Sequence, residues 1–178
     1  MNSINRNQAE HHLQHLSQAD AIAKIRELVD KAGTCFFCTA VPTGVSSGTR
    51  PMNVLETDEQ GNLWFLCAAD SHTHAEISIC PDVKLYFQGS PHSDFLQLDG
   101  KASISTDKEK IKELWNPLLK TWFTEGIDDP RIAIIQVKPL QGYYWDTKHG
   151  NLVAGIKILI GAATGMTLDD SIEGKLSV

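Results

Sequence analysis

The residues that are best suited to bind a ligand directly follow an apolar stretch, Leu63–Ala68, whose composition is typical of a buried strand. Asp70, Ser71 and Thr73 are good N-cap residues, so a helix is predicted to begin here and to continue through Ile79. A helix N-terminus presents free backbone N–H groups and the positive end of the helix dipole. The junction of this strand and this helix is therefore a candidate site for an anion such as a phosphate group.

Arg50 is a second residue that suits an anion, because a guanidinium can hold a phosphate with two parallel hydrogen bonds. It lies in the sequence TRPMNV, and the turn TDEQGN between it and Leu63–Ala68 predicts a hairpin. A hairpin would place the strand of Arg50 beside the strand that leads to Ser71. The spacing alone leaves an alternative open, in which Ser71 only caps a helix and Arg50 is a solvated strand residue.

Two pairs of potential metal ligands occur in the sequence, but neither has the geometry of a metal site. His72 and His74 are two residues apart, so on a helix they would point to nearly opposite sides, and no third ligand follows at suitable spacing. Cys35 and Cys38 form a C-x-x-C in a β-branched and aromatic segment. In a strand their odd offset places the two thiols on opposite faces. We therefore expect no metal site and interpret the cysteines as reduced thiols.

Periodicity and turn residues predict the elements that must position these side chains. The clearest helix begins near Ser17 and ends at Gly33, and a second helical stretch, Asp107–Phe123, is broken before Pro117. The apolar run Leu152–Ala163 predicts a further packed helix. Strands are predicted over Thr34–Val41, Thr49–Thr57, Leu63–Ala68, Val83–Phe87 and Asp94–Thr106, and two more on either side of Pro139.

Six or seven strands in hairpin order, with few helices between them, predict a mainly β fold, an antiparallel barrel with α-helices packed against it. Strands and helices do not alternate, which argues against a doubly wound nucleotide-binding fold. At 178 residues the chain fits one domain. We expect this domain to span residues 17–165, preceded by a disordered tail over residues 1–16 and followed by a polar tail over residues 166–178.

Composition and charge exclude several classes of partner. Hydrophobic residues make up 42% of the chain and charged residues 21%, as in an ordinary globular protein. The formal net charge of −6 argues against nucleic acid, because binding to a phosphate backbone needs a dense positive field. The longest apolar run is shorter than the ~20 residues of a membrane span, and the first residues lack the apolar region of a signal peptide. We expect a cytoplasmic protein without a membrane partner.

Several ordered motifs resemble those of one known family. TRPMNVL, LWFLCAADSHTHAEI, PDVKLYF and LDGKASI follow one another as in the pyridoxamine 5′-phosphate oxidase-like FMN-binding split-barrel proteins. The later segments LWNPLLKTWFTEGIDDPRIAIIQVKP and YYWDTKHGNLV are similar to the general stress protein branch of that superfamily. The resemblance implies a six-stranded antiparallel split barrel and a homodimer with FMN bound at the subunit interface.

The same resemblance implies which residues contact the cofactor. Arg50 matches the strand arginine that holds the FMN phosphate, and Ser71 matches the serine that opens the phosphate turn. Cys67 replaces a threonine that lines the cofactor, and Thr73 stands where related oxidases have a lysine, which weakens the expected grip on the phosphate. Trp145 matches a tryptophan that reaches the cofactor from the partner subunit. The complete set of implied cofactor-binding residues is Arg50, Pro51, Met52, Leu66, Cys67, Ser71, His72, Thr73, Trp122 and Trp145.

The resemblance also limits the activity. The true oxidases recognise pyridoxine phosphate through an Arg-Leu-His triplet, and this chain has Asn151, Leu152 and Val153 at the matching place. We therefore expect an FMN-dependent oxidoreductase that acts on an unknown small molecule with an unknown electron donor, and not a pyridoxamine phosphate oxidase. A flavin carries the redox chemistry itself, so no catalytic acid or base need appear. The alternatives are a non-catalytic protein that stores or senses flavin and, less favoured, a metal-binding protein.

Overall fold

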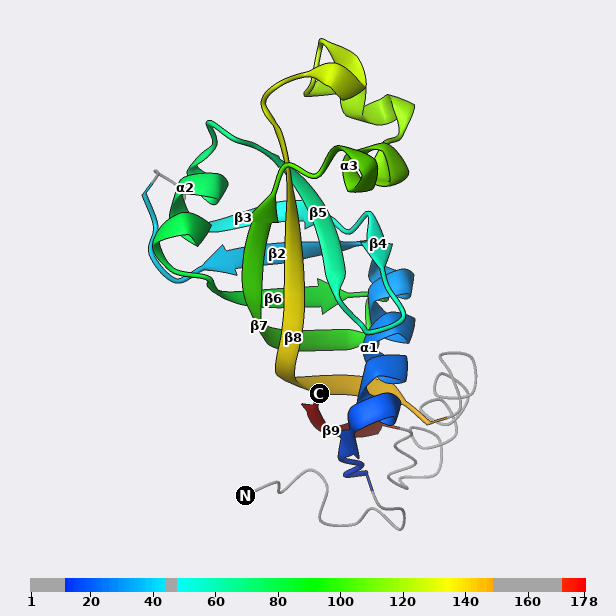
Figure 1. Cartoon of the computed structure of the whole chain (residues 1–178). Coiled ribbons are helices and arrows are strands. Elements are labelled where there is room, and N and C mark those ends of the chain that lie inside the picture. Colours follow the sequence, from blue (N-terminus) through cyan, green and yellow to red (C-terminus); the bar gives the residue numbers. More distant parts are fainter. Residues whose placement is uncertain (1–11, 44–47, 149–170) are drawn as a thin grey trace.

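The computed structural model describes residues 12–43, 48–148 and 171–178, and every structural statement below concerns these ranges. Within them the fold is mainly β, with a twisted sheet that curls into a barrel and with helices packed around it (Figure 1). The strands are β1 (Leu16–Ser17), β2 (Thr34–Thr39), β3 (Thr49–Asn53), β4 (Glu56–Thr57), β5 (Leu63–Ala68), β6 (Asp82–Gln88), β7 (Phe95–Ser105), β8 (Ile132–Thr147) and β9 (Ser171–Ser177).

Three α-helices and two short 3₁₀ helices complete the described structure. They are α1 (Gln18–Ala32), α2 (His72–Ile79), α3 (Lys108–Leu114), η1 (Pro117–Thr121) and η2 (Gly126–Asp128). The predicted end of the first helix at Gly33 is confirmed, since this glycine has φ 66° and its N–H donates to the carbonyl of Val29. The predicted break before Pro117 is confirmed as well, because α3 ends at Leu114 and η1 begins at the proline. None of the helices in these ranges is long and apolar enough to cross a membrane.

The long strand β8 is the centre of the sheet. It pairs antiparallel with β7 along its length, with β5 over its first half and with β9 over its second half. We expected two strands around Pro139, and this was wrong, because β8 continues through the proline. Pro139 lies opposite Gly100, next to a shift of register between β7 and β8, so its missing N–H falls at a bulge. The register shift thus lies directly beside Gly100 of β7.

The barrel encloses one main hydrophobic core. Phe37 of β2 and Phe65 of β5 meet edge to face with ring centroids 5.3 Å apart, and Leu85 of β6 is fully buried with them. The helix α1 lies against one side of the barrel and buries its apolar stripe there (Figure 1). The excursion α3–η1–η2 covers one end of the barrel and has a second, smaller apolar cluster.

The second predicted strand, Thr49–Thr57, is divided in the structure. Its first part, β3, pairs with β2, whereas only the short β4 pairs with β5. The chain changes sides at Val54 and Leu55, whose N–H groups donate to Gly33 and Trp64 respectively. The expectation that a hairpin places the strand of Arg50 directly beside β5 was therefore wrong.

Both predicted tails contain residues that join the sheet. Strand β9 lies within the expected polar tail over residues 166–178, and it pairs antiparallel with β8 and parallel with β1. Leu176 of β9 is 1% exposed and belongs to the main core. The alternation of Ile172, Gly174 and Leu176 is too short and too weak to stand out as a strand pattern. The helix predicted over residues 152–163 lies outside the described residues.

The position of Leu176 predicts that the C-terminal strand is part of the folded domain. Leu176→Ala should lower the free energy of unfolding by about 2–4 kcal/mol, because it removes buried side-chain volume from the core. Val178→Ala is the matched control, since Val178 is 41% exposed and should change stability by less than about 0.5 kcal/mol. Urea unfolding of both variants measures the difference, and equal stabilities would show that β9 does not contribute to the core.

Candidate functional site

The junction of β5 and α2 is built as the sequence predicts. Strand β5 alternates buried and half-buried residues up to Ala68, and α2 begins at His72 with Ser71 as its N-cap. The Ser71 hydroxyl accepts a hydrogen bond from the N–H of His74 at 3.2 Å. The N–H groups of His72 and Thr73 belong to the first helical turn, which has no intrahelical acceptor for them. This helix end thus presents donors to a ligand.

Arg50 reaches this helix end from β3. It is the register partner of the buried Phe37 and therefore points to the inner side of the sheet. Its guanidinium donates to the Thr73 hydroxyl at 2.9 Å and to a carboxylate oxygen of Glu76 at 2.5 Å. The side chain of Arg50 is 16% exposed, so the alternative of a solvated strand residue was wrong. The structure brings Arg50 to the first turn of α2 by a different route from the predicted hairpin.

Glu76 is the residue that the sequence analysis missed. It is fully buried on α2, and its carboxylate accepts hydrogen bonds from the Thr39 hydroxyl, the Thr43 N–H and hydroxyl, and Arg50. Burial alone would raise the pKa of Glu76, but the donors of Thr43 and Thr39 and the charge of Arg50 outweigh it and hold the pKa at about 2. Glu76 is therefore a carboxylate over the whole ordinary pH range.

The first turn of α2, with Ser71, His72 and Thr73, forms a cradle for an anion together with Arg50 and Glu76. The charges of Arg50 and Glu76 are opposite, so these two ions give the cradle no net positive charge. Thr73, at the position where a lysine was expected from the family pattern, is 7% exposed and accepts a hydrogen bond from Arg50. His72 is exposed, and its ring nitrogen Nδ1 lies 3.2 Å from the Thr43 hydroxyl. An anion would be held here chiefly by hydrogen bonds from the guanidinium and the helix end. The donor set fits a phosphate group.

The two predicted cofactor-lining residues of β5 point to opposite sides. Cys67 is buried in the main core, and burial raises the pKa of its thiol to about 11, against a smaller opposite effect of a hydrogen bond with Ser71. Leu66 faces the second apolar cluster under the α3–η1–η2 excursion. Cys67 is thus a neutral thiol next to the helix cap, and it is not suited to act as a nucleophile at neutral pH.

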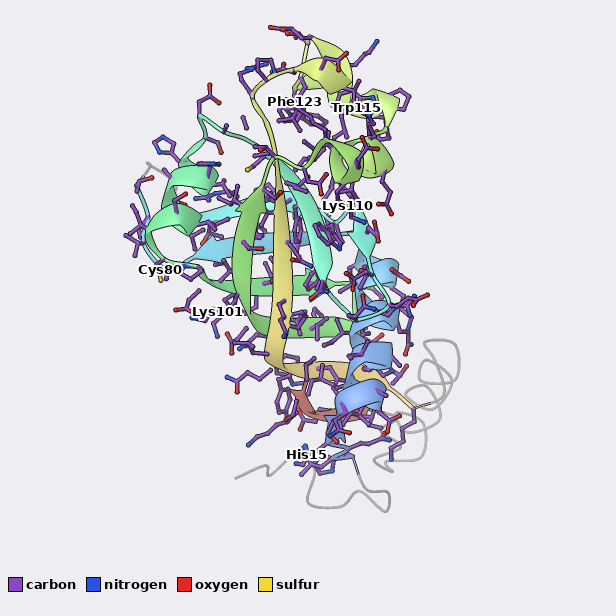
Figure 2. The ribbon with its side chains drawn as sticks, in the orientation of Figure 1. His15, Cys80, Lys101, Lys110, Trp115 and Phe123 are labelled. Atoms are coloured by element: carbon purple, nitrogen blue, oxygen red, sulfur yellow. The ribbon has the colours of Figure 1, made fainter. Side chains whose placement is uncertain are left out.

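Hydrogen bonds connect the end of the excursion α3–η1–η2 to the junction of β5 and α2. The N–H of Ala69 donates to the carbonyl of Arg131 at 2.7 Å, and the Arg131 guanidinium contacts the carbonyl of Trp122 at 3.5 Å. Arg131 also holds Asp129 with hydrogen bonds of 3.0 and 2.7 Å, which lower the pKa of that carboxyl to about 2. Trp122 itself is 62% exposed. Trp115 and Phe123 lie inside the excursion and pack in its apolar cluster (Figure 2).

The remaining predicted residues lie elsewhere on the barrel. Met52 packs against the main core, whereas Pro51 and Trp145 line an open groove of about 630 Å³ on the outer face of the sheet. The other aromatic residues of this groove are Phe36, Tyr86, Phe87 and Phe95. The structure therefore groups Arg50, Ser71, His72, Thr73 and Cys67 at one site, Pro51 and Trp145 at a second, and leaves Trp122 apart from both.

The predicted metal alternatives find no support in the described residues. Within residues 12–43, 48–148 and 171–178, no three or more His, Cys, Asp or Glu side chains are arranged to hold a metal ion. Cys35 is buried and Cys38 is half-buried, as expected for the two faces of β2, and both are free thiols. Burial raises the pKa of Cys35 to about 12. The two thiols of the C-x-x-C therefore differ in burial, as residues on the two faces of β2 do.

Comparison with known proteins places this geometry in a family. The sequence model of the family described as "Pyridoxamine 5′-phosphate oxidase like" matches residues 20–169. Protein bli-3 of Neurospora crassa is 32% identical over 87 residues, which cover 41% of this chain and 42% of that protein. The matched region thus spans less than half of that relative.

Two solved structures have the same fold. One is a protein from Jannaschia sp. CCS1 described as a candidate general stress protein 26, with a TM-score of 0.74, 20% identity, and coverage of 90% of this chain and 100% of that chain. The other is the general stress FMN/FAD binding protein of Xanthomonas citri, with a TM-score of 0.55, 24% identity, and coverage of 67% and 82%. The split-barrel fold implied by the sequence is therefore confirmed.

The low pKa of Glu76 predicts a specific pH dependence of stability. Because this pKa is about 2 in the folded protein and 4.5 ordinarily, the stabilisation is complete above pH 4.5 and is lost as the pH falls toward 2. The difference in unfolding free energy between wild type and Glu76→Gln should shrink by about 1 kcal/mol from pH 6 to pH 3.5. Urea unfolding at both pH values measures it. Glu109→Gln, which changes an exposed glutamate, should show no such trend, and a constant difference for Glu76→Gln would contradict the assignment.

Proposed function

Because the chain belongs to the pyridoxamine 5′-phosphate oxidase-like family, we propose that it binds FMN with the phosphate at the junction of β5 and α2. The observation that carries this proposal is the direction of Arg50, whose guanidinium lies against the first turn of α2. A guanidinium and free helix N–H groups at one place form a combination that suits a phosphate. The Xanthomonas citri protein of the same fold is an FMN/FAD binding protein, which supports a flavin as the ligand.

Each residue of the cradle has a distinct part in this proposal. Arg50 would donate to the phosphate with N–H groups that remain beside those used for Thr73 and Glu76. The N–H groups of His72 and Thr73 would donate from the helix end, and the Ser71 hydroxyl would add a further contact. Bound FMN would supply the redox chemistry, and the chain would bind and orient it.

Glu76 has two opposite effects on such a site. It fixes the guanidinium of Arg50 through a buried ion pair, which pre-organises the donors for a phosphate. It also cancels the charge of Arg50, so the long-range attraction for a phosphate dianion is weaker than that of a lysine-containing site. The cradle is therefore expected to recognise phosphate by the geometry of its hydrogen bonds more than by net charge.

We also propose that two copies associate through the outer face of the sheet. Pro51, Phe36 and Tyr86 are register partners on β3, β2 and β6, and they form one exposed row. Phe36 is 59% exposed, Tyr86 43% and Trp145 42%. Contiguous aromatic exposure of this kind marks interaction surfaces. In a symmetric pair Trp145 of one copy would approach the flavin held by the other.

For the activity we propose a flavin-dependent oxidoreductase that acts on an unknown small molecule. The sequence at residues 151–153, which lie outside the described ranges, lacks the triplet of a true pyridoxamine phosphate oxidase. The second candidate is a non-catalytic protein that stores or senses flavin, and it would hold the phosphate with the same Arg50–Glu76 cradle. Reduction of the bound flavin by NADPH or NADH distinguishes the two. If NADPH and NADH reduce the bound flavin no faster than they reduce free FMN, the result supports the non-catalytic candidate.

The phosphate cradle is tested by comparing a double variant with a single variant. Arg50→Gln/Glu76→Gln removes the guanidinium without leaving a buried charge unpaired, and Glu76→Gln alone keeps the guanidinium. The double variant should bind FMN about 10- to 100-fold more weakly than Glu76→Gln, which corresponds to the loss of hydrogen bonds to a charged group. Riboflavin, which has no phosphate, should bind both variants equally. Flavin fluorescence titrations measure these affinities, and equal losses for FMN and riboflavin would place the phosphate elsewhere.

The proposed dimer is tested by placing a charge in the exposed aromatic row. Wild-type protein should sediment as a dimer at micromolar concentration, and Phe36→Glu should shift it to a monomer, because a buried unpaired carboxylate is costly. Leu118→Glu is the matched control, since Leu118 is 78% exposed but lies on η1, away from the groove. If Phe36→Glu remains a dimer while Leu118→Glu dissociates, the interface includes the excursion instead.

A further inference from the structure

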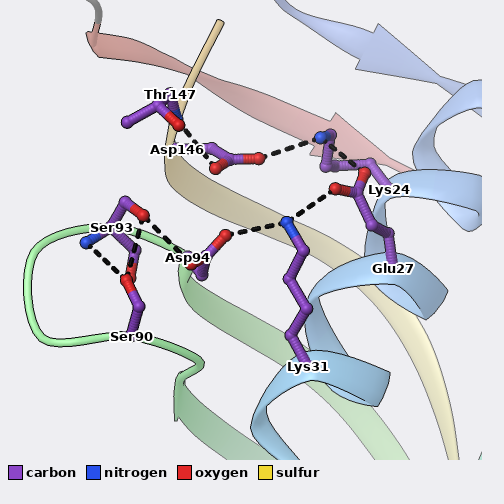
Figure 3. Close-up of polar contacts among 8 residues, drawn as sticks. All are labelled: Lys24, Glu27, Lys31, Ser90, Ser93, Asp94, Asp146 and Thr147. Carbon is purple, nitrogen blue, oxygen red and sulfur yellow. Dashed lines mark hydrogen bonds and ion pairs between the residues drawn. The ribbon is translucent and has the colours of Figure 1, made fainter. Parts of the chain in front are cut away.

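A chain of alternating charges connects α1 to the ends of two strands on the side of the barrel away from the phosphate cradle. Lys24 pairs with Asp146 at 3.0 Å and with Glu27 at 2.7 Å, and Lys31 pairs with Glu27 and Asp94, both at 2.8 Å (Figure 3). The two lysines are seven residues apart and so lie on one face of α1. Glu27 joins them, and the result is one continuous network of five ions.

The two aspartates of this network are buried. The side chains of Asp94 and Asp146 are each 5% exposed, whereas Lys31 and Glu27 remain more than 40% exposed. Asp146 also accepts from the N–H of Thr147 at 2.7 Å. Neither aspartate touches the predicted phosphate site, and the family resemblance assigns no role to either. In both pairs the carboxylate is buried and depends on its lysine, because removal of the lysine would leave an uncompensated buried charge.

Each buried aspartate is adjacent in sequence to an aromatic residue on the opposite side of the sheet. Asp94 precedes Phe95, and Asp146 follows Trp145. Phe95 and Trp145 are register partners on β7 and β8, and both line the outer groove. Trp145 and Asp146 are successive residues of β8 and point to opposite faces, so fixing Asp146 on the α1 side also fixes Trp145 on the groove side. Asp94 lies directly before the first residue of β7, Phe95, and its ion pair with Lys31 anchors that end of the strand.

The backbone at Asp94 shows that this end of β7 is held under constraint. Asp94 has φ 59°, a left-handed conformation that is unfavourable for most residues other than glycine. The neighbouring turn is closed by the Gly89 N–H, which donates to the carbonyl of Asp94 at 2.9 Å. The Ser93 hydroxyl donates to the Asp94 carboxylate at 3.0 Å (Figure 3). Such strain persists where several contacts determine the geometry together, and it is frequent next to functional positions.

We propose that Lys24–Asp146 and Lys31–Asp94 are positioning pairs that fix the aromatic wall formed by Phe95 and Trp145. This inference rests on the proposed function, in which Trp145 approaches a flavin. The ion pairs lie on the α1 side of the sheet and restrict the strand ends that carry Phe95 and Trp145. Trp145 would therefore contact a planar ligand in one orientation. Glu27 contacts both lysines, so the loss of one ion pair should change the positions of both aromatic residues.

The test is a double-mutant cycle on FMN affinity. Asp146→Asn keeps the shape of the side chain and an acceptor for Thr147, but it removes the charge that holds Lys24. It should weaken FMN binding about 5- to 10-fold, and it should have no further effect in a Trp145→Phe background. Glu56→Gln is the control, because Glu56 of β4 also forms an ion pair with a lysine, Lys110 of α3, but it lies apart from Phe95 and Trp145. This control should leave FMN affinity unchanged.

A second measurement needs no flavin. The fluorescence anisotropy of Trp145, taken as the difference between proteins with and without Trp145→Phe, should fall in Asp146→Asn well below its melting temperature. A loss of affinity that persists without Trp145, an equal loss in Glu56→Gln, or an unchanged anisotropy would each overturn the inference. If wild-type protein binds no FMN, the proposed function fails, and the anisotropy alone then decides whether the network positions Trp145.

Discussion

The buried carboxylate of Glu76 is the constraint on which one end of this barrel depends. A charge in a protein interior must be paired and hydrogen-bonded, and Glu76 meets this requirement with Thr39 at the end of β2, Thr43 in the following loop and Arg50 on β3. Three segments are thereby drawn to α2. The orientation of Arg50 follows from this requirement, and so does the shape of the cradle at the helix end. A residue with no expected part in ligand binding thus determines where the main cation of the site lies.

Buried carboxylates on the opposite side of the barrel are also paired with cations, but there the cations come from one helix. There the buried charges are Asp94 and Asp146, and their partners come from a single helix, α1, which is already packed on the barrel through its apolar stripe. The strand β8 joins the two regions, because its first half contacts β5 and its second half contains Trp145 and Asp146. Its continuity through Pro139 matters for this reason. Through this continuity a single strand contacts β5 with its first half and carries Trp145 in its second half.

Much of this arrangement is predictable from local sequence. The start of α2, the left-handed end of α1 at Gly33, the break before Pro117 and the two faces of β2 follow from caps, turn residues and alternation. The partner of Arg50 does not, because a glutamate on a short helix looks like any solvated surface residue. The signal was its place on the buried stripe with Thr73 and Ile77, which becomes readable only when the helix face is known. Strand β9 and the pairing of β3 depend on contacts between distant segments, which no local pattern encodes.

The division of the second strand at Val54 and Leu55 has one more consequence. It leaves β3 as the last strand in the sheet order, paired with β2 alone among the described strands. An edge of this kind is a template on which another chain can add a strand and start an aggregate. Pro51 sits in the middle of β3 and supplies no N–H, which interrupts the row of donors that such an addition requires. The edge that the split barrel must expose is thus protected from open-ended addition of strands.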